Sequence, residues 1–378
     1  MDFDYSEEQQ LLGDSLKKYL GQAYDFESRK KLIASASGHN DAAWATFAEM
    51  GLTAIPFAPE DGGFGGGAVD LMAAMEAFGE ALVVEPMLDN IGLAGRLVAK
   101  AGSAAQRQGI LSGMLEGSAK LAFASFERGR RYALDPINTT GTANAGGWLL
   151  NGEKVVVVGA PVADTLIVSA RTGQGASLFA VPAKTAGVTL RSYRTVDGQR
   201  AADITFNKVQ VSADSLLGAV GAALPVIEEA VDFATALVCA DAVGAMKSAN
   251  DATLEYLKTR KQFGAPIGTN QVLQHRVVDM YIACEQSRSM AIWAACKVDA
   301  LAGKTDAASV AERKAAVSQA MVLIADSARL VSQESVQLHG GMGMTEELKV
   351  SHTFRRLTVL GQRFGDADHH LARYATVS

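Results

Sequence analysis

The stretch LGQRFGDADHHL, residues 360–371, places Asp366 and Asp368 beside His369 and His370. Carboxylates next to imidazoles are typical of metal sites and of acid–base pairs. These polar residues are nearly consecutive, so they cannot all converge on one ion, and the sequence predicts no metal site. A helix N-terminus is the simpler interpretation, in which Asp366 or Asp368 caps the helix and its charge faces the helix dipole.

Two other motifs combine charged, aromatic and glycine residues. In TRKQFGAPIGTNQ, Arg260 and Phe263 precede a Gly/Pro turn and a helix start at Gln271. This arrangement offers a platform for an anion and an aromatic ring. In QLHGGMGMTEE, residues 337–347, the glycines would let the backbone approach a ligand closely. Each motif alone is equally consistent with an ordinary junction between helices.

Helices and strands alternate in blocks along the chain. Apolar residues at helical spacing fill the first third, where Ser6 is a predicted N-cap. The middle third has short β-branched and aromatic runs separated by turns, with Asn151-Gly152 as a predicted hairpin turn. No GxGxxG follows a strand, which argues against a doubly wound nucleotide fold.

Long apolar helices are predicted in the last third, at Leu224–Lys261, Gln271–Leu301 and Ala307–His339. Helices this apolar usually bury more than one face, so we expect an oligomer. The chain is thus predicted to be an α+β protein of three domains. These are an N-terminal helical domain (1–119), a middle antiparallel β-barrel domain (120–218) and a C-terminal four-helix bundle domain (219–378).

Composition excludes several classes of protein. The chain has 378 residues, is 48% hydrophobic and carries a net charge of −6, which argues against a nucleic-acid binder. No apolar run reaches the ~18 residues of a membrane span, and the acidic N-terminus does not resemble a signal peptide. Cys239, Cys284 and Cys296 are predicted core thiols. We therefore expect a cytoplasmic protein.

In this order on an α–β–α chain, the motifs resemble those of the acyl-CoA dehydrogenase family. The resemblance covers nearly the whole chain, through EEQ, PEDGGFGG, LNGEK, TRKQFGAPIG, QLHGGMG and FRR. It implies that family's fold, bound FAD and an acyl-CoA substrate that is desaturated between Cα and Cβ. In the family a glutamate removes the α-proton and flavin N5 takes a hydride. Such a proton is weakly acidic, so the site must desolvate the base and stabilise the enolate.

The positions that the family gives to its base carry no acid here. The usual glutamate falls on Phe364, and the alternative position, on the first helix of the C-terminal bundle, falls on Ala234. Asp366 is a weak candidate for a relocated base, and Glu127 and Asp232 are weaker ones. Flavin contacts in the barrel are altered too. Their positions are occupied by Phe126, Tyr132, Val156 and Val158.

The losses fall on one half of the family's shared flavin site. The resemblance implies that the Arg–Phe–Gln and Gly-rich motifs reach across to the flavin of a neighbouring subunit, and this half is retained. The chain is most similar to small subunits of bacterial two-subunit, pimeloyl-CoA type acyl-CoA dehydrogenases. The implied cofactor-binding residues are Arg260, Phe263, Gln271, Gln337, Gly340, Gly341, Asp366 and Asp368.

The resemblance also implies partners. These are an electron-transfer flavoprotein or similar acceptor, and either a second copy in a homodimer or a second dehydrogenase subunit in a heterotetramer. Two alternatives stay open. One is a self-sufficient homomer with a relocated carboxylate base. The other is a structural subunit that binds acyl-CoA or flavin without chemistry of its own.

Overall fold

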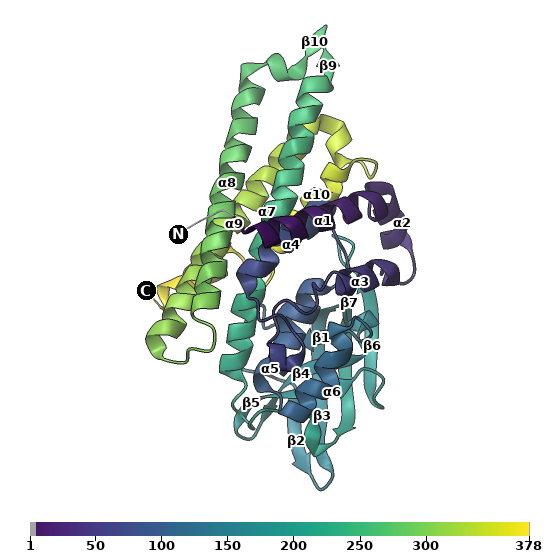
Figure 1. Ribbon diagram of the computed structural model, residues 1–378, viewed down its shortest axis with the longest axis vertical. Coiled ribbons are helices and arrows are strands. Elements are labelled where there is room, and N and C mark those ends of the chain that lie inside the picture. Colours follow the sequence, from purple (N-terminus) through teal and green to yellow (C-terminus); the bar gives the residue numbers. More distant parts are fainter. Residues whose placement is uncertain (1–4, 378) are drawn as a thin grey trace. The chain divides into compact units, whose positions relative to one another are not determined.

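A computed structural model describes residues 5–377 (Figure 1). Packing divides the chain into two compact units, each assembled from segments that are distant in sequence. A helical unit combines Met1–Lys30, Ala68–Val83 and Thr235–Ser378, and a β-rich unit combines Lys31–Gly67 and Val84–Ala234. The three sequence-continuous domain ranges given above stay a prediction, because these units describe packing rather than domain boundaries.

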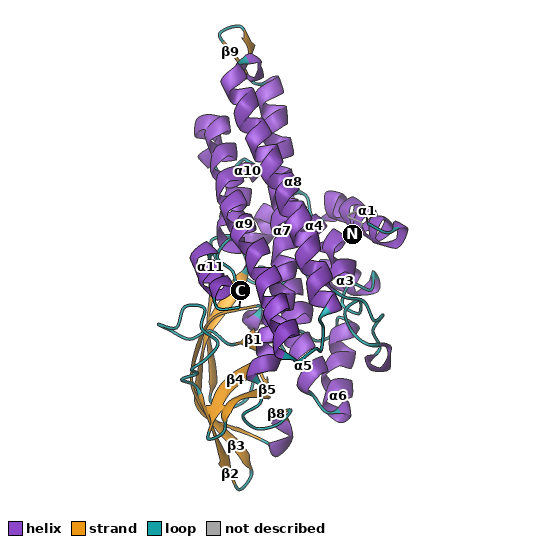
Figure 2. Ribbon diagram, turned by 90° about the vertical axis from the view of Figure 1, so that its left-hand side faces the viewer, coloured by secondary structure: helices purple, strands orange, loops and turns teal. Residues whose placement is uncertain are grey.

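The helical unit confirms the predicted elements closely. Its long helices end within two residues of the predicted positions. They run side by side toward a hairpin of two short strands, β9 (Lys261–Gln262) and β10 (Ala265–Pro266) (Figures 1 and 2). Ser6 caps the first helix in a capping box with Gln9. The predicted four-helix bundle consists of three long and two short helices. The helices of this unit are α1 Glu7–Ala23, the start of α2 Phe26–Ala34, α4 Ala68–Ala81, α7 Leu224–Thr259 from residue 235, α8 Gln271–Ala300, α9 Ala307–His339, α10 Lys349–Leu360 and α11 Ala367–Ala375.

Two glycines allow α4 and α7 to cross with their backbones in contact. A Cβ atom on Gly79 would lie 1.9 Å from the Asp241 carbonyl oxygen, and one on Gly244 would lie 1.9 Å from that of Glu76. No other residue type fits at so short a distance. At the same crossing, the buried Asp241 carboxylate accepts a hydrogen bond from Arg356 Nε at 3.3 Å, which ties α10 to α7.

The β-rich unit contains one eight-stranded sheet in the order β6-β7-β3-β2-β4-β5-β8, with β1 beside β4. Most pairs are antiparallel as predicted, but β1–β4 and β2–β4 are parallel. Sequence periodicity cannot distinguish these pairings, because they join segments far apart in the chain. The path of the sheet runs from β6 to β8, and among the described residues these two strands do not pair to close a barrel. The strands are β1 Leu121–Ala124, β2 Thr140–Asn144, β3 Gly147–Val158, β4 Thr165–Thr172, β5 Gly175–Pro182, β6 Val188–Arg194, β7 Arg200–Val211 and β8 Leu216–Leu217.

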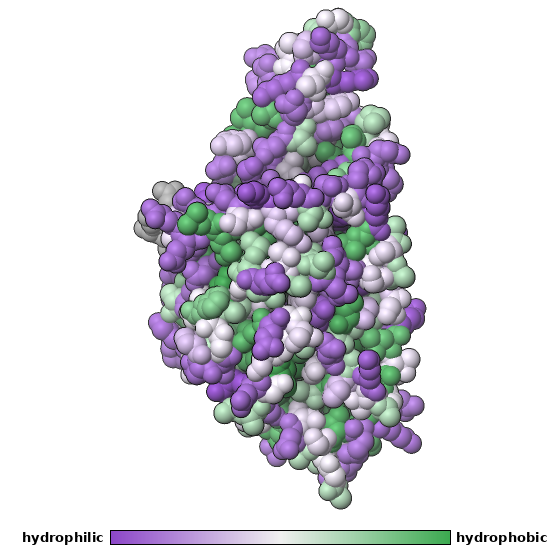
Figure 3. Space-filling model, turned by 45° about the vertical axis from the view of Figure 1, so that its right-hand side comes forward, coloured by the Kyte–Doolittle hydropathy of each residue, from purple (hydrophilic) through white to green (hydrophobic). Residues whose placement is uncertain are grey.

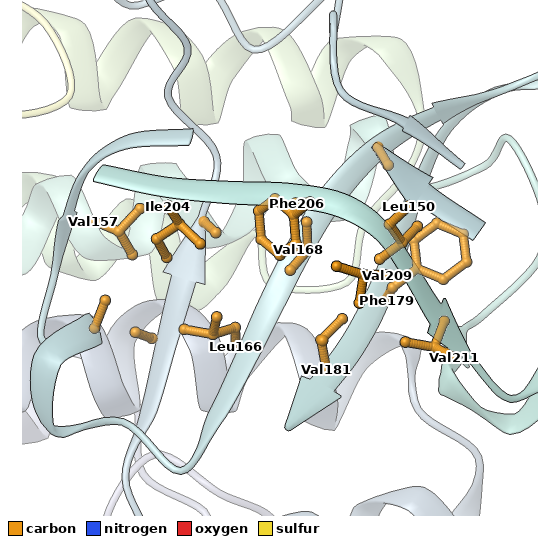
Figure 4. Close-up of a cluster of buried hydrophobic side chains, with 14 of the residues drawn as sticks. Leu150, Val157, Leu166, Val168, Phe179, Val181, Ile204, Phe206, Val209 and Val211 are labelled. Atoms are coloured by element: carbon orange, nitrogen blue, oxygen red, sulfur yellow. The ribbon is translucent and has the colours of Figure 1, made fainter. Parts of the chain in front are cut away.

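Side chains on one face of this sheet form its hydrophobic core (Figure 4). They include Leu150, Val168, Phe179 and Phe206, all nearly inaccessible to solvent. The helices of the same unit are α3 Asp41–Glu49, the π-helix η2 Leu88–Gly95, α5 Arg96–Ala101 and α6 Ala104–Leu115, besides the end of α2 and the start of α7. The burial of such side chains is the main favourable term in the stability of the sheet.

The predicted hairpin turn at Asn151-Gly152 is wrong. Strand β3 continues through these residues, and its pairing with β7 shifts register between Leu150 and Gly152, as in a β-bulge. The turn lies earlier, between β2 and β3, where Asn144 pairs with Gly147. Asn–Gly sequences favour bulges as well as turns, which explains the misassignment.

One helix contradicts the expectation about membrane spans. The segment Ala307–Met344, which includes α9, is long and apolar enough to cross a membrane, and 56% of its most apolar window is buried in the protein. Core helices of this length often pass such a test, so the finding is weak as an indication of a membrane. Of the three cysteines, Cys239 and Cys284 are buried as predicted, whereas Cys296 is half-buried.

Replacement of Gly79 by alanine should destabilise the protein, because the added methyl would force the α4 and α7 backbones apart. We expect a loss of about 3 kcal/mol in the free energy of unfolding, at the upper end for an overpacked core. Gly21 in α1 is the matched control. A Cβ there meets nothing within 4 Å, so Gly21→Ala should stabilise by about 0.5–1 kcal/mol. Urea unfolding measures both. Equal effects of the two substitutions would contradict a tight crossing.

Candidate functional site

The first motif forms a hairpin at the end of α7. Strands β9 (Lys261–Gln262) and β10 (Ala265–Pro266) pair around a two-residue turn, Phe263-Gly264. Both turn residues have positive φ, 52° and 86°, the combination of a type I′ turn. The backbone is anchored because the Arg260 N–H donates to the Tyr256 carbonyl at 2.8 Å. The hairpin is therefore held at its base.

Side chains at this hairpin project away from the fold. The Phe263 ring is fully exposed, and Arg260 and Gln271 are exposed. Among residues 5–377, the Arg260 guanidinium has no hydrogen-bond or ion-pair partner. A free guanidinium beside an exposed ring suits a planar anion or a phosphate group.

The second motif follows α9 and lies against the base of the hairpin. His339 is buried, its Nδ1 lies 2.7 Å from the Ser335 carbonyl, and its ring stacks on Tyr256 at 4.4 Å. Burial lowers the pKa of His339, so the ring is a neutral structural contact. The geometry supports a contact at the C-terminal end of α9 as the role of this ring. The stack brings the two motifs together.

The Gly-rich turn itself is open. Gly340 and Gly341 are exposed, and a Cβ on either would meet nothing within 4 Å. Gln337, one helical turn earlier, is exposed as well. The turn continues as the 3₁₀ segment η6 (Gly340–Met344). Its backbone is therefore accessible to a ligand.

The loop between α10 and α11 encloses Phe364. This side chain is 7% exposed and its φ is 60°, an unfavourable region for an aromatic residue. The Arg363 guanidinium lies 5.1 Å from the centre of its ring, within cation–π range. Phe364 is thus a packed, apolar residue with no group that could accept a proton.

Asp366 caps α11, which confirms the interpretation of the DADHH stretch as a helix N-terminus. Its Oδ1 accepts a hydrogen bond from the His369 N–H at 2.9 Å. His370 turns inward instead, and its Nδ1 lies 3.3 Å from Ser318 Oγ on α9. Asp368 is exposed. The polar side chains diverge, and within residues 5–377 no group of three or more His, Cys, Asp or Glu could hold a metal ion.

In the β-rich unit, Val156 is strained and exposed. Its φ is 53°, rare for a β-branched residue, and the side chain is 49% exposed. Asp203 accepts a hydrogen bond from the Val156 N–H at 3.2 Å, from Tyr193 Oη at 2.9 Å and from Arg191 at 2.5 Å. Burial alone would raise the pKa of Asp203, but these donors lower it. Asp203 therefore stabilises the strained segment as a carboxylate, a role that no sequence pattern indicated.

Glu127 belongs to a buried ion pair. It accepts hydrogen bonds from Lys154 Nζ at 2.9 Å and from the Asn138 and Thr139 N–H groups at 2.6 and 2.8 Å. Burial lowers the pKa of Lys154 to about 8 even though Glu127 opposes the shift. These hydrogen bonds hold the Glu127 carboxylate against Lys154 and the loop before β2, so it is poorly suited to act as a base. Asp232 is fully buried in α7, and the neighbouring Ala234 is buried too.

Known proteins resemble this chain along most of its length. It matches the N-terminal domain of acyl-CoA dehydrogenases at residues 6–118, their middle domain at 122–209 and their C-terminal domain at 223–376. A probable acyl-CoA dehydrogenase of Bacillus subtilis, YngJ, is 28% identical over 373 residues, which cover 94% of this chain and 93% of that protein.

Solved structures show the same fold. The ChsE4-ChsE5 complex from Mycobacterium tuberculosis contains a chain that is 25% identical, with a TM-score of 0.89 and coverage of 100% of this chain and 98% of that one. The FAD complex of PigA, at 24% identity, has a TM-score of 0.89 with the same coverage. At that identity the likeness supports the fold alone.

Removal of the helix cap should weaken the C-terminal helix. Asp366→Ala leaves the first N–H groups of α11 without their acceptor, so we expect a loss of about 1 kcal/mol in the free energy of unfolding. Asp366→Asn is the control, because asparagine caps equally well and should keep the stability. Thermal unfolding compares the three proteins. An unchanged midpoint in Asp366→Ala would refute the cap.

Acid should destabilise the protein through its buried histidines. Burial, with Arg373 and His369 adding to it, lowers the pKa of His370 to about 3, whereas an unfolded histidine titrates near 6.5. Below pH 6.5 the unfolded chain therefore binds a proton that the folded chain does not, and stability falls with pH. From pH 7 to pH 5 this residue alone should cost about 2 kcal/mol.

Urea unfolding at both pH values tests this. His370→Gln should show a smaller difference between pH 7 and pH 5, by about 2 kcal/mol. Gly21→Ala, which changes no titrating group, should keep the wild-type difference. An unaltered pH dependence in His370→Gln would show that the folded protein binds this proton.

Proposed function

Because the chain belongs to the acyl-CoA dehydrogenase family, we propose that it works as one subunit of a heteromeric, FAD-dependent acyl-CoA dehydrogenase. In this proposal the chain lends its hairpin and Gly-rich turn to the flavin of a catalytic neighbour. The observation that carries the proposal is the contrast between an open, unpartnered Arg260–Phe263 hairpin and a buried Phe364 where a base is expected. Oxidoreductase activity of the acyl-CoA dehydrogenase type follows from the family itself.

The residues of the hairpin and the Gly-rich turn fit the phosphate and adenosine end of FAD. Arg260 would donate charge-assisted hydrogen bonds to the pyrophosphate. Gln271 and Gln337 offer amide groups, and Gly340 and Gly341 leave backbone accessible. When bound, FAD supplies the acceptor for the hydride that leaves the β-carbon of the thioester.

The other half of such a site fits poorly in this chain. Neither Phe364 nor Ala234 can remove the α-proton, and both are buried. Asp366 and Asp368 would bring negative charge toward a pyrophosphate, which is unfavourable. Val156 offers no side-chain hydrogen bond to a flavin ring. We therefore derive no proton transfer from this chain, and we assign that step to the neighbour.

One of the similar solved structures supports the proposal of a partner subunit. The chain is 25% identical to one in the ChsE4-ChsE5 complex, which is an assembly of two named proteins. The resemblance of its motifs to those of small, pimeloyl-CoA type subunits is a further reason to propose the same arrangement. An electron-transfer flavoprotein as electron acceptor and a cytoplasmic location are parts of this proposal. The acyl group that the assembly would accept is left open by these residues.

A second candidate is a self-sufficient homomer in which Asp366 acts as the base. Asp366 is the carboxylate nearest in sequence to Phe364, and it is partly accessible to solvent. Its Oδ1 accepts a hydrogen bond from the His369 N–H, which supports the capping role instead. A third candidate is a subunit that binds flavin or acyl-CoA and has no chemistry of its own.

Flavin content and turnover of the purified chain separate these candidates. We expect the unmixed protein to retain little FAD and to show little or no turnover with an artificial electron acceptor and a range of acyl-CoAs. Robust turnover would establish the self-sufficient homomer. Activity that appears only on mixing with a second dehydrogenase subunit encoded nearby would support the heteromer. A mixture that also shows no activity would favour the structural subunit.

Arg260→Ala should weaken flavin retention in the mixed assembly. Loss of a charge-assisted hydrogen bond costs about 1.5–3 kcal/mol, which corresponds to roughly a 10- to 150-fold rise in the dissociation constant. Lys261→Ala is the control, because it removes a neighbouring exposed charge that is not one of the implied cofactor-binding residues. Flavin fluorescence after gel filtration measures the retained cofactor. Equal retention in both variants would count against the assignment of Arg260.

A further inference from the structure

A small pocket in the helical unit shares no residue with the candidate site. It has a volume of about 160 Å³ and is formed by the end of α1, the start of α2, the end of α4 and the start of α10. Its apolar lining includes Leu20, Tyr24 and Phe26, of which Leu20 and Tyr24 are buried. At about 30 Å³ for each water-sized group, the pocket has room for a short hydrocarbon chain.

The side chain of Lys349 lines this pocket without a partner. Within residues 5–377 its amine makes no hydrogen bond and no ion pair, and the residue is half-buried. Lys349 is also the first residue of α10, a helix whose N-cap residue makes no side-chain hydrogen bond. Because the helix dipole is positive at this end, a cation is unfavourable there. The position therefore disfavours the protonated form of the amine.

The two acids that line the pocket are engaged by other groups. Glu80 pairs with Lys17 at 3.6 Å. Asp25 accepts a hydrogen bond from the Ser28 N–H at 2.9 Å, in the first turn of α2. Neither carboxylate forms an ion pair with the Lys349 amine, so a protonated amine there would be poorly compensated.

The charges around the pocket have the same effect on the amine. Burial lowers the pKa of Lys349, the carboxylate of Glu80 opposes this shift, and the guanidinium of Arg29 adds to it. A desolvated lysine close to another cation is an environment that activates an amine as a nucleophile. The activation has a simple reason, since the neutral amine has a free lone pair and the ammonium has none.

Acyl thioesters are electrophiles that such an amine can attack, and acyl-CoA dehydrogenases act on acyl-CoA thioesters. The pocket places an apolar surface directly beside the amine. A short acyl chain that lies on this surface would hold its thioester carbonyl near the nitrogen, and proximity of this kind accelerates a reaction between two groups.

We propose that Lys349 is a modification site, acylated on Nζ by short-chain acyl-CoA thioesters. The amine attacks the thioester carbonyl carbon, so that a C–N bond forms and the C–S bond breaks. The leaving thiolate takes the proton that the nitrogen loses. The products are an amide and the free thiol of CoA, and no atom is oxidised or reduced. The acyl chain then lies over Leu20 and Phe26, and the start of α10 no longer carries a cation.

This inference goes beyond the proposed function and needs neither flavin nor a partner subunit. Failure of the heteromer or of flavin retention leaves the acylation of Lys349 intact. Conversely, an unreactive Lys349 leaves the assignment of Arg260 intact. The two proposals can therefore be refuted separately.

Incubation of the purified chain with butyryl-CoA near neutral pH tests the assignment, with acylated lysines located by peptide mass spectrometry. Lys258 and Lys261 are internal comparisons, because both are exposed and have no partner in the described part of the chain. They lie at the end of the α7–α8 pair, where Figure 3 shows mainly hydrophilic residues. We expect Lys349 to react about tenfold faster than either, since it combines an activated amine with a bound chain.

Two variants and a shorter reagent give further readouts. Lys349→Arg should abolish acylation at this position and leave that of Lys261 unchanged, because a guanidinium stays charged. Glu80→Gln removes the acid that favours the protonated amine, so Lys349 should react about twofold faster or more. Acetyl-CoA should acylate Lys349 about fivefold more slowly than butyryl-CoA does, because two fewer methylene groups are buried. Lys261 should show no such preference.

Three results would overturn the proposal. A rate at Lys349 equal to that at Lys261 would show that the amine is not activated. Equal rates with the two reagents at Lys349 would show that the pocket does not hold the acyl chain. A rate that Glu80→Gln leaves unchanged would show that ionisation of the amine does not control the reaction. Circular dichroism of both variants checks that they keep the fold.

Discussion

Gly79 and Gly244 bring the backbones of α4 and α7 into contact, and the rest of the helical unit depends on this crossing. Asp241 lies at the contact point, so its buried carboxylate has a fixed position. That carboxylate pairs with Arg356 and thereby orients α10. Helix α10 in turn leads into the loop that holds Phe364 and the cap at Asp366. One close approach of two helices thus determines where the start of α11 lies.

Buried charged side chains also position the backbone in the β-rich unit. Lys154 has no exposed surface and pairs with Glu127. The Glu127 carboxylate also accepts hydrogen bonds from two N–H groups of the chain before β2. Asp203 on β7 has a comparable role, because it accepts a hydrogen bond from the N–H of the strained Val156 on β3. Removal of one partner from a buried pair usually costs more than the pair contributes, because it leaves a charge uncompensated. In both units, carboxylates therefore serve to fix backbone rather than to react.

Much of this could be predicted from the sequence, because it follows from local pattern. The long helices have continuous apolar periodicity, and Ser6 and Asp366 sit at helix starts with their capping partners three residues later. Strand β2, with the sequence TGTAN, has no apolar alternation, so no pattern in the sequence predicts it. The parallel pairings of β4 join residues more than twenty positions apart, which periodicity does not encode.

The candidate site could also be predicted only in part from the sequence. The motifs around Arg260 and Gly340 were visible as combinations of residue types, whereas their contact through Tyr256 and His339 was not, since stacking leaves no spacing signature. The role of Asp203 could not be predicted, because a single aspartate in a strand has no sequence signal for the groups that it contacts.

The Tyr256–His339 stack has a consequence for how such a chain can diverge. It links the two exposed motifs to each other without a contact from the loop at Phe364. In the proposed heteromer, the acid that the family places at position 364 can therefore be lost while the hairpin and the Gly-rich turn persist. One codon change would then remove one activity, and selection from the partner would keep the other half. Division of labour between two gene copies requires no new fold here, only the physical independence of two surfaces.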